Sequence, residues 1–119
     1  MLSPKRILLA FSYTLKGLRS AWRSEAAFRD DVLLVVGVQL FCLWLQPPLW
    51  LWLFVALGNA LLLVVELLNT GIEYIADHIS TEHHVLLGSA KDVGSAAVFI
   101  LLCFNCLLLG VMIYLRWFY

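Results

Sequence analysis

The longest predicted helix lies in residues 49–77, LWLWLFVALGNALLLVVELLNTGIEYIAD. Its first 17 residues carry no charge. As a helix they would extend roughly 26 Å at about 1.5 Å per residue, close to the roughly 30 Å of a bilayer's hydrocarbon layer. Polar residues then recur at helical spacing, and Glu66, Asn69, Glu73 and Asp77 fall on one stripe about 80° wide. The sequence therefore predicts a membrane-spanning helix over 49–79 with an acidic stripe at its inner end.

The acidic stripe calls for a functional explanation. An ionised acid at the centre of a membrane span costs about 2.5–3.5 kcal/mol on insertion scales, and less near the interface. Asp77 alone reads as the solvated end of a helix, but Glu66 directly follows the long uncharged run. A carboxylate at the edge of the hydrocarbon layer can reach the polar head of a lipid. The stripe thus favours chemistry on a lipid over chemistry on a soluble metabolite.

The composition of the 119-residue chain agrees with a membrane protein. Apolar residues make up 63%, charged residues only 13%, and the mean hydropathy is +0.93, whereas soluble domains are about 25% charged. The net charge of zero gives no basic surface for nucleic acid, and the apolar content excludes disorder. We expect one integral membrane domain over residues 1–119.

The gaps between charged residues indicate two further spans. Residues 32–65 are uncharged but interrupted by Pro47 and Pro48, which mark a turn between two helices. Residues 93–115 form a second uncharged run, long enough to cross a bilayer. We therefore predict an all-α membrane protein with spans at 29–46, 49–79 and 90–117. Seven basic residues on the side of the N-terminus and the 80–90 loop, against Arg116 alone on the other, place that side in the cytoplasm. The C-terminus is expected on the periplasmic side.

The segment before the first span predicts an amphipathic helix over residues 5–28, lying on the membrane surface. Phe11, Leu15, Leu18 and Trp22 recur on one face, while most basic residues fall on others. Glu25 projects close to the apolar stripe, because it follows Leu18 by seven positions. A carboxylate in that position needs a partner, a metal ion or access to water.

The beginning of the third span suggests a site for an anion. Ser89 and Asp92 resemble a capping box at a helix N-terminus. Lys91 is not explained by that motif, because the helix dipole disfavours a cation there. An anion bound at this terminus would gain from both the free amides and the ammonium group, and phosphate is the natural candidate.

Three segments resemble signature segments of the small bacterial diacylglycerol kinases: residues 24–29 (SEAAFR), 66–73 (ELLNTGIE) and 90–98 (AKDVGSAAV). The resemblance covers nearly the whole chain. It implies a homotrimer of nine transmembrane helices in the bacterial inner membrane, with active sites shared between neighbouring subunits. It also implies transfer of the γ-phosphate of ATP, with Mg²⁺, to the hydroxyl of 1,2-diacylglycerol, giving phosphatidate.

The resemblance also implies roles for individual residues. Glu66 would be the general base on the lipid hydroxyl, Asn69 would organise the site, and Glu25 and Glu73 would bind the metal ion. The residues implied in nucleotide binding, beyond the two metal ligands, are Arg6, Tyr13, Glu82, His83, His84, Lys91 and Asp92. The residues implied in binding the lipid, besides Glu66, are Arg6, Arg19, Trp22, Phe28, Arg29, Trp44 and Ser95.

Two alternatives stay open beside this interpretation. An undecaprenol kinase shares the fold and the motifs around Glu66 and Lys91 and differs in its lipid; residues 25–29 and 94–97 favour the diacylglycerol branch. A non-enzymatic membrane subunit could use Glu66, Glu73 and Asp77 as an ion relay. A relay gives no reason for Lys91 or Glu25.

Overall fold

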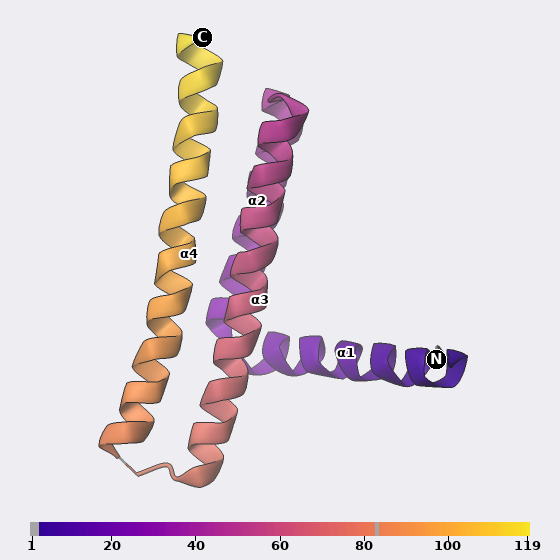
Figure 1. Ribbon diagram of the computed structural model, residues 1–119, viewed down its shortest axis with the longest axis vertical. Helices are drawn as coiled ribbons and strands as arrows, with labels where there is room; N and C mark the ends of the chain where they lie inside the picture. The colour runs from indigo at the N-terminus through magenta and orange to yellow at the C-terminus, as the bar shows by residue number, and fades with distance from the viewer. Residues whose placement is uncertain (1–2, 83) are drawn as a thin grey trace.

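The protein consists of a three-helix bundle with a fourth helix leaving its side. The computed structural model describes residues 3–82 and 84–119, and its helices are α1 (Pro4–Ser24), α2 (Ala26–Leu45), α3 (Leu49–Ile79) and α4 (Val85–Phe118). The helices α2, α3 and α4 run side by side, and α1 projects away from them at a steep angle (Figure 1). The predicted all-α fold is therefore confirmed.

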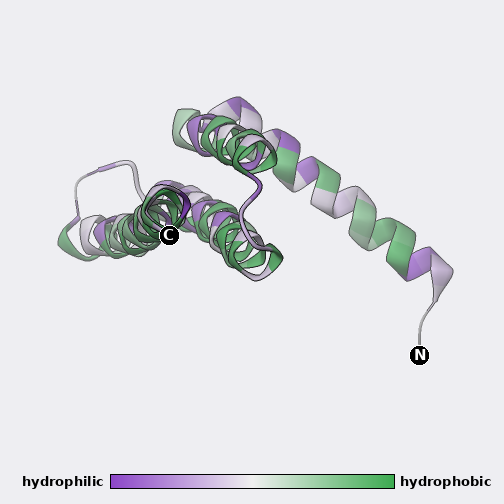
Figure 2. Cartoon of the chain, turned by 90° about the horizontal axis from the view of Figure 1, so that it is seen from above, coloured by the Kyte–Doolittle hydropathy of each residue, from purple (hydrophilic) through white to green (hydrophobic). Residues whose placement is uncertain are grey.

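The bundle helices are apolar on most of their surface. Large apolar side chains are exposed along α2, α3 and α4, and green, the colour of apolar residues, predominates on these helices when they are seen from above, with purple polar residues among it (Figure 2). Within the described residues, α3 and α4 are the helices long and apolar enough to cross a membrane. Helix α2 is 20 residues long but carries Arg29, Asp30 and Asp31 in its first turns.

The turn between α2 and α3 lies at the predicted proline pair. Gln46 adopts a left-handed conformation with φ of 51°, and its N–H donates to the carbonyl of Cys42 at 2.8 Å. A residue in this conformation commonly follows the last turn of a helix. Pro48 then precedes the first residue of α3. A cluster of buried side chains closes this end of the bundle, formed by Cys42, Leu45, Leu51, Val55 and Met112.

The prediction of one surface helix over residues 5–28 is wrong at its C-terminal end. Glu25 is extended, with φ of −117° and ψ of 108°, and it separates α1 from α2. Arg29, one turn into α2, donates from Nη1 to the carbonyl of Trp22 at 2.6 Å. An arginine bound to the last carbonyls of a helix stabilises that end. The chain can therefore change direction at Glu25, and Phe28 becomes a buried residue of α2.

Helix α4 begins earlier than the sequence motif predicted. Its N-cap is His84 and its first residue is Val85, so Ser89 and Asp92 lie inside the helix and form no capping box. The N–H of Gly88 donates to the carbonyl of His84 at 2.8 Å, which closes the first turn. Nothing between residues 85 and 90 removes a backbone donor as proline would, so the helix extends back to the loop.

Candidate active site

Three neighbouring polar residues in the second half of α3 are buried in the bundle. Glu66, Asn69 and Thr70 are buried, with 4%, 7% and 3% of their surfaces exposed. The Thr70 hydroxyl donates to the backbone carbonyl of Glu66 at 3.0 Å. Because the hydroxyl is used by the backbone, the Glu66 carboxyl remains available to partners on other helices.

Asp31 of α2 is the partner of Glu66. The two carboxyl groups are close enough to interact directly. Asp31 directly precedes the uncharged run of residues 32–65, and no sequence motif assigned it a role. The pairing arises from the packing of α2 against α3. Because Asp31 and Glu66 lie far apart in the sequence, no local sequence pattern predicts it.

A second carboxylate pair forms where α1 meets α2. Glu25 interacts with Glu73, which lies two turns beyond Glu66 on α3. Glu73 also accepts a long hydrogen bond of 3.4 Å from Asn69 Nδ2. The structure thus brings the two predicted metal ligands, Glu25 and Glu73, together within one chain. The extended conformation of Glu25 places its side chain beside α3 rather than along the surface of α1.

The Glu25–Glu73 pair fits a magnesium ion in its chemistry. Mg²⁺ in phosphoryl-transfer sites is usually held by one or two carboxylates, with water and substrate phosphates completing the octahedron. No group of three or more His, Cys, Asp or Glu side chains arranged for a metal ion occurs among the described residues. A site made by this pair therefore needs further oxygen ligands from water or from substrate phosphates.

Helix α1 is held against α3 by hydroxyl groups next to this pair. The Tyr74 hydroxyl is hydrogen-bonded to the Ser20 hydroxyl at 3.0 Å and also to that of Ser24. These contacts fix the end of α1 just before Glu25. They thereby hold the backbone that carries one of the two carboxylates.

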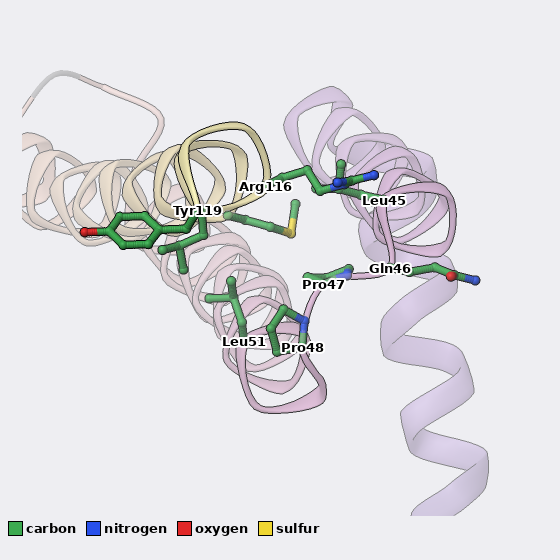
Figure 3. Close-up of a pocket in the computed structure, with 9 residues that line it drawn as sticks. Leu45, Gln46, Pro47, Pro48, Leu51, Arg116 and Tyr119 are labelled. Atoms are coloured by element: carbon green, nitrogen blue, oxygen red, sulfur yellow. The ribbon is translucent and has the colours of Figure 1, made fainter.

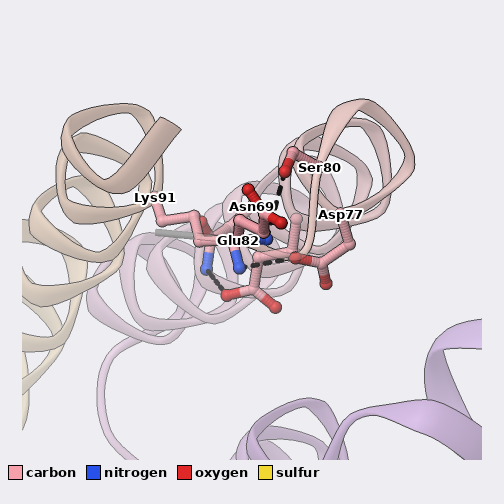
Figure 4. A network of polar contacts seen from close by, with 6 residues as sticks. Asn69, Asp77, Ser80, Glu82 and Lys91 are labelled. Atoms are coloured by element: carbon pink, nitrogen blue, oxygen red, sulfur yellow. Dashed lines mark hydrogen bonds and ion pairs between the residues drawn. The ribbon is translucent and has the colours of Figure 1, made fainter. Parts of the chain in front are cut away.

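Lys91 of α4 forms an ion pair with Asp77 of α3. Its Nζ lies 2.6 Å from Asp77 Oδ1, and both side chains are substantially exposed (Figure 4). Since Lys91 lies in the second turn of α4, the prediction that it sits at a helix N-terminus is wrong. Its ammonium group instead meets the acidic stripe of α3, and Asp77 is more than a solvated helix end.

A small pocket opens beside Lys91 in the loop between α3 and α4. Its volume is about 190 Å³, and the residues that line it are Ser80, Thr81, Glu82, His84, Leu87, Gly88 and Lys91. The backbone N–H of Glu82 donates to the Ser80 hydroxyl at 3.0 Å, which shapes the loop (Figure 4). The pocket unites three residues predicted to bind nucleotide: Glu82, His84 and Lys91. A fourth, His83, lies outside the described residues.

Other predicted residues are not gathered at this centre. Arg6 and Tyr13 lie on the N-terminal half of α1, which points away from the bundle in both whole-chain views (Figures 1 and 2). Trp44 is 71% exposed near the far end of α2. Asp92 and Ser95 are exposed on α4. Arg19 lies on the exposed surface of α1 with Lys16 and Arg23.

An apolar groove lies between α1 and the buried part of α3. It has a volume of about 390 Å³ and lies between α1 and α3, lined by Thr14, Gly17, Leu18, Ser20, Ala21, Leu67, Thr70, Gly71 and Tyr74. Two of these residues, Leu67 and Thr70, are close neighbours of Glu66 along α3. The groove therefore offers apolar surface next to the buried carboxylate.

A further cavity lies at the opposite end of the bundle. It has a volume of about 360 Å³ and is formed around Leu45, Leu51, Met112 and the proline turn. Arg116 extends from α4 toward the end of α2 above it (Figure 3). The described residues that line it include no carboxylate. This cavity therefore lacks the groups that a metal-dependent reaction requires.

The fold and this arrangement of acids define an all-helical, membrane-associated protein with a polar site at one end of its bundle. Residues 12–114 match the prokaryotic diacylglycerol kinase family. The chain is 42% identical over 95 residues to a diacylglycerol kinase of Escherichia coli K12, covering 80% of this chain and 78% of that protein. It is 44% identical over 106 residues to the one of Pseudomonas aeruginosa, covering 82% and 80%. The chain belongs to the prokaryotic diacylglycerol kinase family.

A more distant member gives the same assignment. The diacylglycerol kinase of Helicobacter pylori 26695 is 39% identical over 106 residues, covering 89% of this chain and 83% of that protein. The match of the family extends across all four helices, from the middle of α1 to near the end of α4. The resemblance read from three short segments is therefore confirmed over most of the chain.

Proposed function

We propose that this chain transfers the γ-phosphate of ATP to the free hydroxyl of 1,2-diacylglycerol, giving phosphatidate for phospholipid recycling. The observation that carries the proposal is the position of Glu66, a buried carboxylate beside Asp31 on a helix whose next turns bear Glu73 and Asp77. Membership of the prokaryotic diacylglycerol kinase family supports the same reaction.

Glu66 acts as the general base in this proposal. It takes the proton of the lipid hydroxyl as that oxygen forms a bond to the γ-phosphorus and the bond to the leaving ADP oxygen breaks. A positioned carboxylate within hydrogen-bond reach of the hydroxyl is suited to this task. Asn69, one turn further and bonded to Glu73, keeps the base and the metal ligands in a fixed relation.

Glu25 and Glu73 would hold Mg²⁺ together with phosphate oxygens of the nucleotide. When bound there, the ion would supply positive charge against the charge that develops on the transferred phosphoryl group. Lys91 contributes a second positive charge, and Asp92, Glu82, His83 and His84 contact the nucleotide around it. The pocket in the 80–84 loop supports this assignment, because Lys91 lines it together with Glu82 and His84.

Arg6 and Tyr13 contact the nucleotide of a neighbouring subunit. The part of α1 that carries them points away from the bundle (Figure 1). Side chains placed there reach a nucleotide only in another copy of the chain. This direction supports active sites that are shared between subunits, and the family resemblance implies that the assembly is a homotrimer.

The lipid enters along α1. Its apolar chains use the groove between α1 and α3, while Arg6, Arg19 and Arg29 lie at headgroup level and Trp22, Phe28 and Ser95 contact the glyceride. Trp44 contacts acyl-chain ends, because some 15 residues of helix, or roughly 22 Å, separate it from Arg29. The apolar lining of the groove supports this path.

Three helices cross the bacterial inner membrane in this proposal. Helices α3 and α4 meet the length and hydropathy of a span. Helix α2 crosses beside them, since after Asp31 it carries no charge as far as its end at Leu45. The N-terminus and the 80–84 loop then lie in the cytoplasm, where ATP is available, and the C-terminus lies in the periplasm.

A comparison of two acceptor lipids tests this function. Purified protein in detergent is given labelled MgATP with 1,2-diacylglycerol or with undecaprenol at equal mole fraction. We expect rapid labelling of diacylglycerol and much slower labelling of undecaprenol. Preference for undecaprenol would transfer the chain to that branch of lipid kinases. Absence of transfer to either alcohol would favour a non-enzymatic ion relay.

A further inference from the structure

Helices α3 and α4 meet through two reciprocal contacts between an asparagine and a glycine. Asn105 of α4 packs on Gly58 of α3, where an added Cβ would lie 3.0 Å from the Asn105 Oδ1 atom. Asn69 of α3 packs on Gly94 of α4, where an added Cβ would overlap the Asn69 Oδ1 atom. Each helix therefore supplies one glycine and one asparagine, and the absence of a side chain at each glycine permits the close approach.

The spacing of the two contacts is the same on both helices. Eleven residues separate Gly58 from Asn69, and eleven separate Gly94 from Asn105. Eleven residues are close to three helical turns, so each pair lies on one face and is separated by roughly 16 Å along the axis. Because α3 and α4 run in opposite directions (Figure 1), the two contacts are related by an approximate twofold axis between the helices.

The contact between Asn105 and Gly58, called the outer contact below, leaves no polar group of the asparagine side chain unpaired. Asn105 Nδ2 donates to the carbonyl of Gly58 at 3.0 Å and to that of Leu101 at 2.8 Å. Its Oδ1 accepts from Asn59 Nδ2 at 2.8 Å. An amide with every group satisfied in an apolar bundle favours one register of the helices, because each slip leaves polar groups unpaired.

The same network continues into α2. Asn59 Oδ1 accepts from Gln39 Nε2 at 2.8 Å, and Gln39 Oε1 accepts from Trp52 Nε1 at 2.9 Å. Asn59 is thus the junction of two separate ties, one to α4 through Asn105 and one to α2 through Gln39. Loss of Asn105 removes the first tie and leaves the second in place.

The contact between Asn69 and Gly94, called the inner contact below, is different, because the side-chain amide of Asn69 is not fully hydrogen-bonded. Asn69 Oδ1 is buried and has no hydrogen-bond partner among the described residues. Its Nδ2 makes only the 3.4 Å bond to Glu73. The inner contact therefore defines the helix register weakly by itself, although it lies next to the residues that bind metal and nucleotide in the proposed function.

We propose that Gly58 and Asn105 are positioning residues for the nucleotide site: the outer contact sets the register of α3 against α4. The inference rests on the proposed function, in which α3 supplies Glu73 and α4 supplies Lys91. A slip of one helix along the other separates these two groups. The pair formed by Glu66 and Asp31 joins α3 to α2 and keeps its register through the tie at Gln39.

The kinetic test compares Gly58→Ala and Asn105→Ala with Gly110→Ala and Gly37→Ala. The control glycines have open space where a Cβ would be added. We expect the first two variants to raise the KM for MgATP at least about fivefold, since small misplacements of binding groups are costly. The KM for diacylglycerol should stay unchanged in all four. Loss of folded protein alone would lower kcat and leave both KM values unchanged, and that result would overturn the proposal.

A distance measurement tests the register without relying on activity. Nitroxide labels are placed at Ile75→Cys on α3 and Leu86→Cys on α4, both exposed, in a chain with its three cysteines replaced and diluted with unlabelled chains. We expect Gly58→Ala and Asn105→Ala to shift the distance distribution and Gly110→Ala to leave it unchanged. An unshifted distribution in the first two variants would overturn the proposal, whether or not the protein phosphorylates a lipid. A shifted distribution without any lipid phosphorylation would contradict the proposed function instead.

Discussion

The Nζ atom of Lys91 lies 2.6 Å from Oδ1 of Asp77, and this ion pair joins α4 to the acidic stripe of α3. Both side chains are exposed, by 40% and 53%. Exposed ion pairs contribute about 0–1 kcal/mol to stability, so this one yields readily to a phosphate group. It holds the ammonium group beside the loop pocket in the absence of nucleotide.

Lys91 and Asp77 should therefore differ in their effect on nucleotide binding. Lys91→Met removes the charge that meets the phosphates, and we expect the Kd for MgATP to rise about tenfold or more, as for loss of a charge-assisted contact. Asp77→Asn frees the lysine without removing it, and we expect a change of about threefold or less. Calorimetric titration of MgATP into each variant measures both. Equal weakening by the two substitutions would contradict this division of roles.

Glu73→Gln should alter the dependence on magnesium. The amide keeps the size of the side chain but leaves the Glu25 carboxylate as the one charged protein ligand in the proposed site. We expect the Mg²⁺ concentration for half-maximal activity to rise about tenfold or more, because Mg²⁺ prefers charged oxygen ligands. Activity measured against Mg²⁺ at fixed ATP gives the value. An unchanged requirement would place the metal elsewhere.

Asp31→Asn should lower turnover, with Asp30→Asn as the matched control. Asp31 interacts with the buried Glu66, whereas its neighbour Asp30 is exposed on α2. We expect kcat to fall about tenfold in Asp31→Asn, since a group beside a general base affects proton transfer. Asp30→Asn should keep the wild-type kcat. Initial rates at saturating MgATP and lipid test this, and equal rates in the two variants would show that the Asp31 contact has no catalytic role.

Arg29→Lys should weaken the junction between α1 and α2. The guanidinium donates from Nη1 to two carbonyl groups at the end of α1, those of Trp22 at 2.6 Å and Arg23 at 3.4 Å. A lysine keeps the charge but not the planar arrangement of donors. We expect a loss of about 1 kcal/mol, the usual contribution of a hydrogen bond, as a lower Tm in detergent. Arg23→Lys is the control: it changes a side chain but keeps the backbone carbonyls that accept from Arg29, so it should leave the Tm unchanged.

The sequence predicted the three long helices from uncharged runs and the acidic stripe from helical periodicity, and both signals lie within single helices. The turn at Pro47 and Pro48 and the shared face of Glu66, Asn69 and Glu73 needed no tertiary information. The pairs Asp31–Glu66 and Lys91–Asp77 could not be predicted in this way, since each joins different helices and depends on their packing.

The helix boundaries show a second limit of sequence patterns. The break at Glu25 is stabilised by Arg29 from the following helix, so the amphipathic pattern alone extended α1 too far. The capping motif at Ser89 and Asp92 was misleading because the helix continues back to Val85. In both cases the local pattern was compatible with the predicted boundary. The observed boundary depends on residues outside the pattern: Arg29 for the end of α1, and the residues from Val85 onward for the start of α4.

The role of Glu66 as general base can be measured through the turnover of the Glu66→Gln variant. The substitution preserves the size of the buried side chain and removes its ability to accept the lipid proton. At saturating MgATP and diacylglycerol we predict a loss of kcat of at least about a hundredfold, as for removal of a general base. The Kd for MgATP should stay within about twofold of wild type, because Glu66 is assigned to the lipid hydroxyl and not to the nucleotide. Wild-type turnover in Glu66→Gln would show that Glu66 is not the general base.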